Sequence, residues 1–407
     1  MRRILAFILA LLMISGALPA LAEEAGPGLT LELFTGLPAG QYTALGNGLV
    51  LVTNYDENLY LIFDPYTGQT LPLHAEDADA EAWMPLLSAA WAVEGELVTP
   101  EELMDQYIQE GRPDILSFAL PFLGLDIYRQ GTHYARFRQG LVLDMHTGLL
   151  RPEMSAFPGS LNALTLFVGE NYIKWDYGDP ITLSLHAHDG SLLRSASVTP
   201  DDGPVFWRDA PDGFLFMMHS ELIEKKACEI SLVYVDGDLT VHPTVALGQW
   251  SNRALEPEQA LLSASTGKML LQTRGTILGT KTKVRDSETG RLTVHMEPYG
   301  PFLDGVIVVD MATGAVHPIA VEGDLLYLLG MSYDGSYALL LGGQGTLYRL
   351  DMDSLALTPV ISAAELEALC GPGQGRSVWQ WYGATLPWDG GDFIVLRNVI
   401  FRIIENP

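Results

Sequence analysis

The chain has 407 residues, of which 48% are hydrophobic and 18% charged, so it is neither disordered nor of low complexity. Its 50 acidic and 23 basic side chains give a formal net charge of −27, which argues against a nucleic-acid partner because phosphate binding needs Lys and Arg. The two cysteines, Cys228 and Cys370, exclude a disulfide-rich scaffold and a cysteine-based metal cluster.

The first 22 residues have the organisation of a secretory signal peptide. Arg2 and Arg3 precede an apolar run over 4–14, and Ala20-Leu21-Ala22 supplies a small-x-small cleavage site. A membrane-spanning helix needs ~20 apolar residues, more than this run provides. We therefore expect cleavage after Ala22, no transmembrane segment in the mature chain, and an extracellular or cell-envelope location. Residues 23–407 are then predicted to form a single domain.

One turn pattern recurs along the chain: an alternating apolar run, an Asp, a short spacer that often ends in Thr-Gly, and a second apolar run. These Asp residues stand at positions 64, 144, 189, 236, 310 and 351. In such a hairpin the Asp accepts N–H groups of the turn and the Gly adopts a positive φ. The shorter gaps are 41, 45 and 47 residues, which is typical of a repeated four-stranded unit.

This repeat predicts an all-β chain, a β-propeller of about seven four-stranded blades. The C-terminal runs 392–397 and 399–404 lack a closing strand, and the run 29–34 can supply it. An N-terminal strand in the last blade would leave no sheet edge open. Two packed β-sandwiches are the alternative architecture, although no Pro- or Ser-rich linker separates two halves.

The blade near the C-terminus carries a family resemblance. Its segment 331–341 holds a Ser-x-Asp-Gly-x-Tyr strand, and Leu347-Tyr-Arg-Leu-Asp351 follows. This combination resembles the blades of bacterial TolB-like and WD40-like propellers. The resemblance lies at the level of the repeat, covers 29–407 and is strongest over 305–361. It implies a propeller and specifies no function.

Two insertions, at about 75–125 and 279–303, interrupt the repeat. In the first, a capping box of Thr99 and Glu102 with Gly111 after the last turn predicts a short helix. Ser362 and Glu365 form a similar box before the last blade, so we expect two short helical decorations. The second insertion is basic and is interpreted as either a solvated hairpin arm or a contact surface; its cations are Lys281, Lys283, Arg285 and Arg291.

The motifs of common enzymes are absent from the sequence. It contains no phosphate-binding loop, no Gly-x-Ser-x-Gly elbow and no His-Glu-x-x-His helix, so no catalytic residue is predicted. His186 and His188 stand two apart and share one face of a strand. They would either hold a metal with a third ligand or form hydrogen bonds to the backbone.

If the Asp turns join the two outer strands of each blade, the remaining loops share the opposite propeller face, where we expect a ligand. These loops are acidic and rich in tryptophan. The acids suit Ca²⁺ or a basic partner, or serve solubility alone. The tryptophans stack on sugar rings or wedge between blades. The candidate ligand-binding residues are Asp56, Asp77, Asp79, Asp176, Asp179, Trp83, Trp207 and Trp381.

Taken together, the sequence predicts a secreted, non-catalytic binding module or scaffold that recognises a protein or a glycan through one propeller face. No cofactor is expected other than Ca²⁺. The alternative is a carbohydrate-active enzyme, a hydrolase or lyase with two carboxylates at the channel mouth. A third interpretation is a structural partner in an envelope complex.

Overall fold

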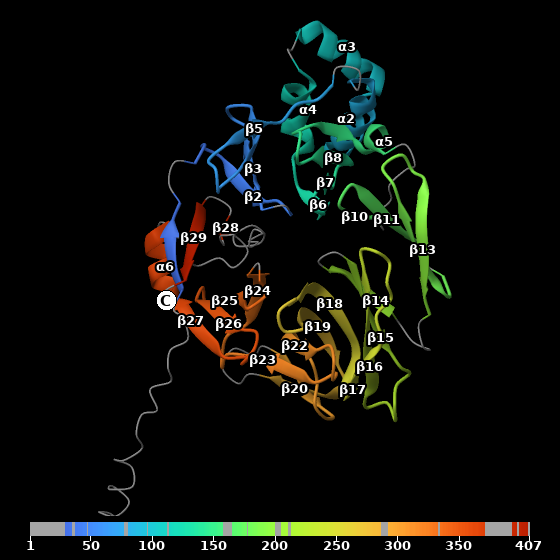
Figure 1. Cartoon of the computed structure of the whole chain (residues 1–407), viewed down its shortest axis with the longest axis vertical. Helices are drawn as coiled ribbons and strands as arrows, with labels where there is room; N and C mark the ends of the chain where they lie inside the picture. Colours follow the sequence, from blue (N-terminus) through green and yellow to red (C-terminus); the bar gives the residue numbers. More distant parts are fainter. Residues whose placement is uncertain are drawn as a thin grey trace, which may run out of the picture.

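The computed structural model of the chain is a ring of seven small antiparallel sheets (Figure 1). It describes residues 29–34, 37–46, 48–76, 80–95, 97–111, 114–157, 165–176, 178–199, 205–210, 213–285, 292–332, 334–370, 393–396 and 399–405. Each sheet is one blade, whose strands we letter a to d from the centre outwards. The predicted all-β propeller with about seven blades is confirmed. The predicted signal peptide, 1–22, lies outside the described residues.

Six blades have four described strands, paired in chain order. Blades one and two comprise β2 (Gln41–Ala44), β3 (Val50–Asn54), β4 (Leu59–Phe63), β5 (Thr70–Pro72), β6 (Ile127–Gln130), β7 (Tyr134–Phe137), β8 (Leu141–Asp144) and β9 (Leu150–Pro152). Blades three and four comprise β10 (Thr165–Val168), β11 (Asn171–Asp176), β12 (Ile181–His186), β13 (Leu192–Val198), β14 (Val205–Ala210), β15 (Gly213–His219), β16 (Cys228–Asp236) and β17 (Val245–Trp250). Blades five and six comprise β18 (Asn252–Leu262), β19 (Lys268–Ile277), β22 (Gly305–Asp310), β23 (Val316–Ile319), β24 (Leu326–Met331), β25 (Tyr337–Gly342), β26 (Leu347–Asp351) and β27 (Leu357–Ile361).

Blade seven is closed by the two ends of the chain. Its described strands are β28 (Phe393–Leu396), β29 (Val399–Glu405) and β1 (Leu29–Leu33). β1 pairs antiparallel with β29, from Leu29 opposite Glu405 to Leu33 opposite Phe401. The predicted closure by an N-terminal strand is therefore confirmed.

The hydrophobic core lies between blades rather than at the centre of the ring. The described residues contain seven buried clusters, one at each junction of neighbouring blades. In β15, Phe214 and Phe216 belong to the junction with blade three, whereas Leu215 and Met217 belong to the junction with blade five. Because successive side chains point to opposite faces, a strand packed on both sides is a continuous apolar run.

The repeated Asp turns have a common hydrogen-bonding scheme. Asp64 Oδ1 accepts the N–H of Tyr66 at 2.8 Å and that of Thr67 at 3.3 Å, and Thr67 Oγ1 donates to Asp64 Oδ2 at 2.6 Å. Gly68 takes the positive φ of 72° that lets the next strand return. Asp144, Asp310 and Asp351 accept the same two N–H groups of their own turns. These aspartates are therefore structural.

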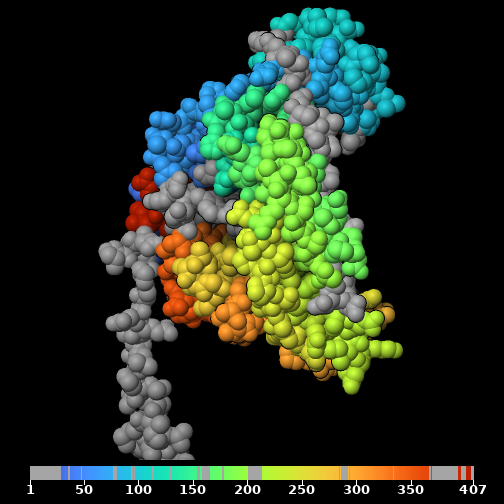
Figure 2. Space-filling view, turned by 45° about the vertical axis from the view of Figure 1, so that its right-hand side comes forward, coloured from blue at the N-terminus to red at the C-terminus, as the bar shows by residue number. Residues whose placement is uncertain are grey.

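The first insertion is a three-helix unit that projects from the edge of the ring (Figure 2, cyan). It comprises α2 (Ala80–Glu94), α3 (Pro100–Glu110) and α4 (Ile115–Leu123). Its apolar side chains, including Trp83 and Leu120, continue the core between blades one and two. The predicted helix is α3: Thr99 Oγ1 accepts Glu102 N–H at 3.2 Å, and Thr99 N–H donates to Glu102 Oε2 at 2.9 Å.

The structure holds more helices than the two that were predicted. The second predicted helix is present as α6 (Ala363–Cys370), but α2, α4 and α5 (Glu153–Ala156) add to the pair. α4 is buried over most of its length. A helix covered on several sides lacks the single apolar stripe by which a helix is usually found in a sequence. None of the described helices is long and apolar enough to cross a membrane.

Candidate functional site

The antiparallel blades give the ring two unlike faces. The a–b and c–d turns emerge on one, which we call the turn face, and the b–c loops and blade-to-blade connections emerge on the other, the loop face. All six Asp turns join strands c and d, as predicted, and so lie on the turn face. Both insertions are on the loop face: α2–α4 connect blades one and two, and 278–304 is the b–c loop of blade five.

Three of the five predicted acidic residues are described, and they lie at two b–c connections of the loop face. Asp56 is exposed in the b–c loop of blade one, and Asp176 and Asp179 are exposed in that of blade three. Blade two stands between them. Asp77 and Asp79 lie outside the described residues. Within the described part of the chain, no three His, Cys, Asp or Glu side chains are placed to share a metal ion. Calcium binding stays a prediction.

Of the three predicted tryptophans, the structure describes the side chain of Trp83. Trp83, on α2, has no exposed surface and packs in the core between blades one and two, so the core interpretation applies to it. Trp207 lies in β14, and its side chain is outside the described part; Trp381 is outside it altogether. Trp91 of α2 is partly buried, with its ring 5.1 Å from that of Phe122.

His186 and His188 belong to an aromatic cluster between blades two and three. They do not share one face of a strand as predicted, because β12 ends at His186 and His188 lies in the turn that follows. His186 Nδ1 lies 3.1 Å from the carbonyl oxygen of Gly190, and its ring stacks on Tyr172 at 5.3 Å. His188 Nδ1 lies 3.4 Å from Tyr134 Oη. Burial raises the pKa of that tyrosine to about 12, and the charge of Asp144 adds to the effect. The backbone interpretation of His186 therefore fits, and this cluster lies on the turn face.

One charged pair on the loop side of blade two was not found from the sequence. Arg136 of β7 donates from Nη2 and Nε to Glu153 Oε2, at 2.8 and 2.9 Å. Their side chains are only 13% and 10% exposed, and the guanidinium carbon lies 5.6 Å from the centroid of the Tyr128 ring. Burial raises the pKa of Glu153, while the charge and hydrogen bonds of Arg136 oppose the rise. Glu153 N–H also donates to Gly140 O at 2.8 Å, which ties α5 to the b–c loop.

The second insertion is a two-stranded hairpin, which we call the arm: β20 (Gly279–Arg285) and β21 (Leu292–Pro298) (Figure 1). The strands pack mainly against each other. Cross-strand partners share one face of a sheet. One face of the arm therefore holds a row of cations beside a row of apolar residues, in the pairs Lys281–Met296, Lys283–Val294 and Arg285–Leu292.

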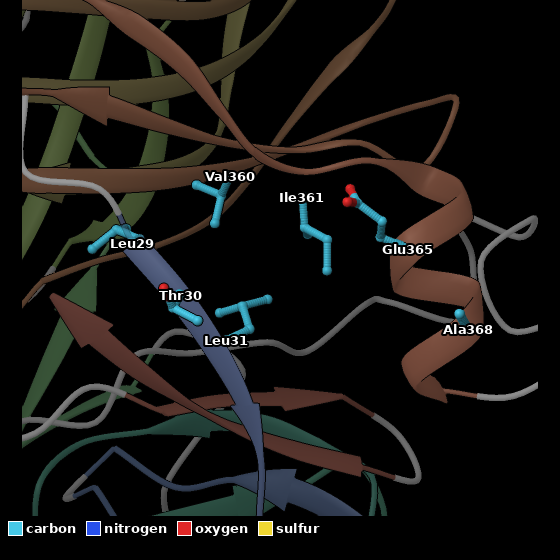
Figure 3. A pocket seen from close by; sticks show the side chains of 7 residues that line it. All are labelled: Leu29, Thr30, Leu31, Val360, Ile361, Glu365 and Ala368. Atoms are coloured by element: carbon cyan, nitrogen blue, oxygen red, sulfur yellow. The ribbon is translucent and has the colours of Figure 1, made fainter. Parts of the chain in front are cut away.

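A shallow groove of about 470 Å³ lies at the seam where the ring closes (Figure 3). Leu29 and Leu31 of β1 form one side, and Val360, Ile361 and the helix α6 form the other. Its one acid, Glu365, accepts Ser362 N–H at 2.9 Å and Ser362 Oγ–H at 2.7 Å as the cap of α6. These bonds lower the pKa of Glu365. The groove is thus an apolar seam whose carboxylate already has partners.

No family model and no curated protein matches the chain. Among solved structures, the chain is similar to KlHsv2 with loop 6CD replaced by a Gly-Ser linker, at 9% sequence identity and a TM-score of 0.39. The alignment covers 91% of this chain and 98% of that chain. A likeness at this level does not assign a function.

Proposed function

We propose that the chain is a secreted, non-catalytic binding module whose loop face recognises a protein partner. One observation carries the proposal: both insertions stand on the loop face, whereas four turns on the other face repeat one hydrogen-bonding scheme. Neither insertion is needed to close the ring. Additions confined to one end of a repeat scaffold are typical of a binding surface.

The side chains on these insertions favour a protein over a glycan. Leu97 and Ile108 of the helical unit are 92% and 66% exposed, and Val294 of the arm is 54% exposed. In the sequence, Leu97 follows Glu96 and Ile108 stands between Asp105 and Glu110. In the arm, Val294 lies opposite Lys283. Apolar side chains interleaved with charges are typical of protein interfaces, whereas sugar recognition favours exposed aromatic rings. Trp83, one of the candidates for such a ring, is buried.

The enzyme alternative has less support. A glycosidase needs two facing carboxyl groups, one of them with a raised pKa. Among the described carboxyl groups, the one with a raised pKa is Glu153, and its neighbour is the cation of Arg136 rather than a second acid.

The test is capture and cross-linking on residues 23–407. The purified chain is incubated with the extracellular and envelope fractions of the organism that encodes it, and a lysine-reactive cross-linker is added. We expect one partner to be captured repeatedly, with its cross-links on loop-face lysines: Lys225, Lys226, Lys281 and Lys283. Lys268 begins β19 on the turn face and is the internal control.

Two outcomes would contradict the proposal. Cross-links confined to Lys268 would place the partner on the other face. A concentration-dependent rise in melting temperature with Ca²⁺ or with one member of a glycan panel, without a captured protein, would identify a small ligand instead.

A further inference from the structure

The arm is supported by its own hairpin and little else. β20 and β21 form a two-stranded sheet, so each strand keeps one edge without a strand partner in the described chain. Seven residues of strand span about 23 Å. Arg285, the last residue of β20, therefore lies farther from the base of the arm than the Debye length, which is about 8 Å at physiological salt.

The cations of the arm have no partners within the described chain. Lys281, Lys283 and Arg285 are exposed, and no described carboxylate forms an ion pair with them. Arg274, just before the arm, is by contrast paired with Glu258. The three free cations alternate along β20, at positions whose side chains share one face.

An apolar row lies beside these cations on the same face. Met296, Val294 and Leu292 are 36%, 54% and 52% exposed. Lysines on an edge strand also serve to prevent unwanted pairing between sheets. Protection alone does not account for three exposed apolar side chains next to them, since polar residues would protect the edge better.

We propose that β20 is a docking strand for an extended acidic segment of a protein partner. The segment adds along the free edge of β20 as a third strand, and its carboxylates, at every second position, pair with Lys281, Lys283 and Arg285. Backbone hydrogen bonds give such strand addition its affinity and the alternating side chains its specificity. The methylene stems of the paired cations then cover the apolar row on β21. The inference rests on the proposed function in taking the partner to be a protein.

Two other occupants fit less well. A bilayer of anionic lipid would face a chain with a formal charge of −27, and hydrocarbon leaves the unpaired edges of a hairpin without hydrogen-bond partners. A second copy of the chain carries the same net charge of −27, so two copies repel each other as they approach.

The probe is a fluorescently labelled eight-residue peptide of alternating Glu and Val, titrated against residues 23–407 by fluorescence anisotropy. We expect saturable binding that weakens as salt rises. The variant K281E/K283E/R285E should lose roughly tenfold in affinity or more, because three charge-assisted contacts become repulsive. R138E/R194E/R253E makes the same change in formal charge at exposed sites elsewhere and should bind like the unaltered chain. All three proteins should melt at similar temperatures, since the substituted side chains are exposed.

Several results would overturn the inference. One is equal binding of the peptide by the arm variant and the control variant, and another is no binding by the unaltered chain. A third is undiminished binding of a peptide with Pro at its centre, because Pro blocks strand pairing. Arm-dependent binding to phosphatidylserine vesicles would favour a membrane, and arm-dependent dimerisation a second copy. If the arm variant still captures the cross-linked partner, this inference fails while the proposed function stands.

Discussion

The two faces of the ring are built by different rules. On the turn face, Asp64, Asp144, Asp310 and Asp351 each accept the N–H groups two and three residues ahead, and the next strand begins at the same offset. On the loop face, the b–c connections range from the short loop 138–140 to the arm. The Asp turns of the turn face resemble one another because each joins strands c and d of a blade. The connections of the loop face differ from blade to blade.

The turn face also holds the blades together. A Cβ added to Gly148 would stand 2.7 Å from Pro72 O of blade one, and one added to Gly314 would collide with Ala246 O of blade four. Each turn is thus packed against the outer strand of the preceding blade. Gly68 of blade one has open space at this position, next to the seam of the ring. The uniformity of the turn face therefore has a second cause in close contact between blades.

The largest change in stability is expected from the buried pair Arg136–Glu153. This pair is an exception to the comparison, because it lies on the loop side of blade two and is structural. Replacing Arg136 by Met keeps the aliphatic stem and leaves Glu153 buried without its cation. Breaking a buried ion pair in this way should lower the free energy of unfolding by about 3 kcal/mol at neutral pH. Urea unfolding of residues 23–407 measures it.

The pH dependence of that variant has a definite sign. Burial raises the pKa of Glu153 in the folded state, and removing Arg136 raises it further. The folded state then binds its proton more tightly than the unfolded state, so stability falls as pH rises through the range above about 4.3. We expect a smaller deficit at about pH 4 than at about pH 7. The double variant R136M/E153Q should recover most of the stability lost at neutral pH, because it removes the buried carboxylate as well. A loss of stability in R136M that does not change with pH would contradict the role given to Glu153.

A smaller effect sharpens the comparison on the turn face. Gly314→Ala and Gly68→Ala introduce the same methyl group at equivalent positions with φ of 75° and 72°. In both variants the positive φ should lower the free energy of unfolding by about 1 kcal/mol, because alanine is strained there. Gly314→Ala should lower the free energy of unfolding by about 2 kcal/mol in all, because its methyl group also meets the backbone of blade four. Equal losses in urea unfolding would show that contact between blades does not constrain the turns.

The turn face was predictable because its chemistry is local. An Asp followed within five residues by a Gly marks five of the six turns, so most of the repeat and the count of about seven blades followed from the sequence. Leu355 shows the limit of such a pattern. It occupies the position of the Thr-Gly glycine in blade six with φ of 59°, so that copy was recognised from its Asp and flanking strands.

The loop face was predictable only in outline. The second insertion was recognised from its basic residues, but the separation of cations and apolar residues onto one face depends on the register of β20 and β21, which no local pattern specifies. The pair Arg136–Glu153 is formed across a blade and a following helix, so neither residue carries a local signal. Trp83 is a core residue because it lies on α2, an unpredicted helix that packs with α4 over the core between blades one and two.

The smallest change in stability is expected from replacing one aspartate on each face, Asp351 on the turn face and Asp176 on the loop face. Burial alone would raise the pKa of Asp351, but hydrogen bonds from Ser354 and the nearby charge of Arg349 outweigh it, so the pKa is lowered. A lowered pKa contributes stability above the unfolded value of about 3.9, and this contribution is lost as pH falls through the folded value. Asp351→Ala should lower the free energy of unfolding by about 1 kcal/mol at neutral pH. This loss should become smaller below about pH 4, where the aspartate of the unaltered chain is protonated. Asp176→Ala, at an exposed position of the loop face, should melt with the unaltered chain at every pH. A comparable loss from Asp176→Ala would mean that the loop-face acids also support the fold, and the division between the faces would fail.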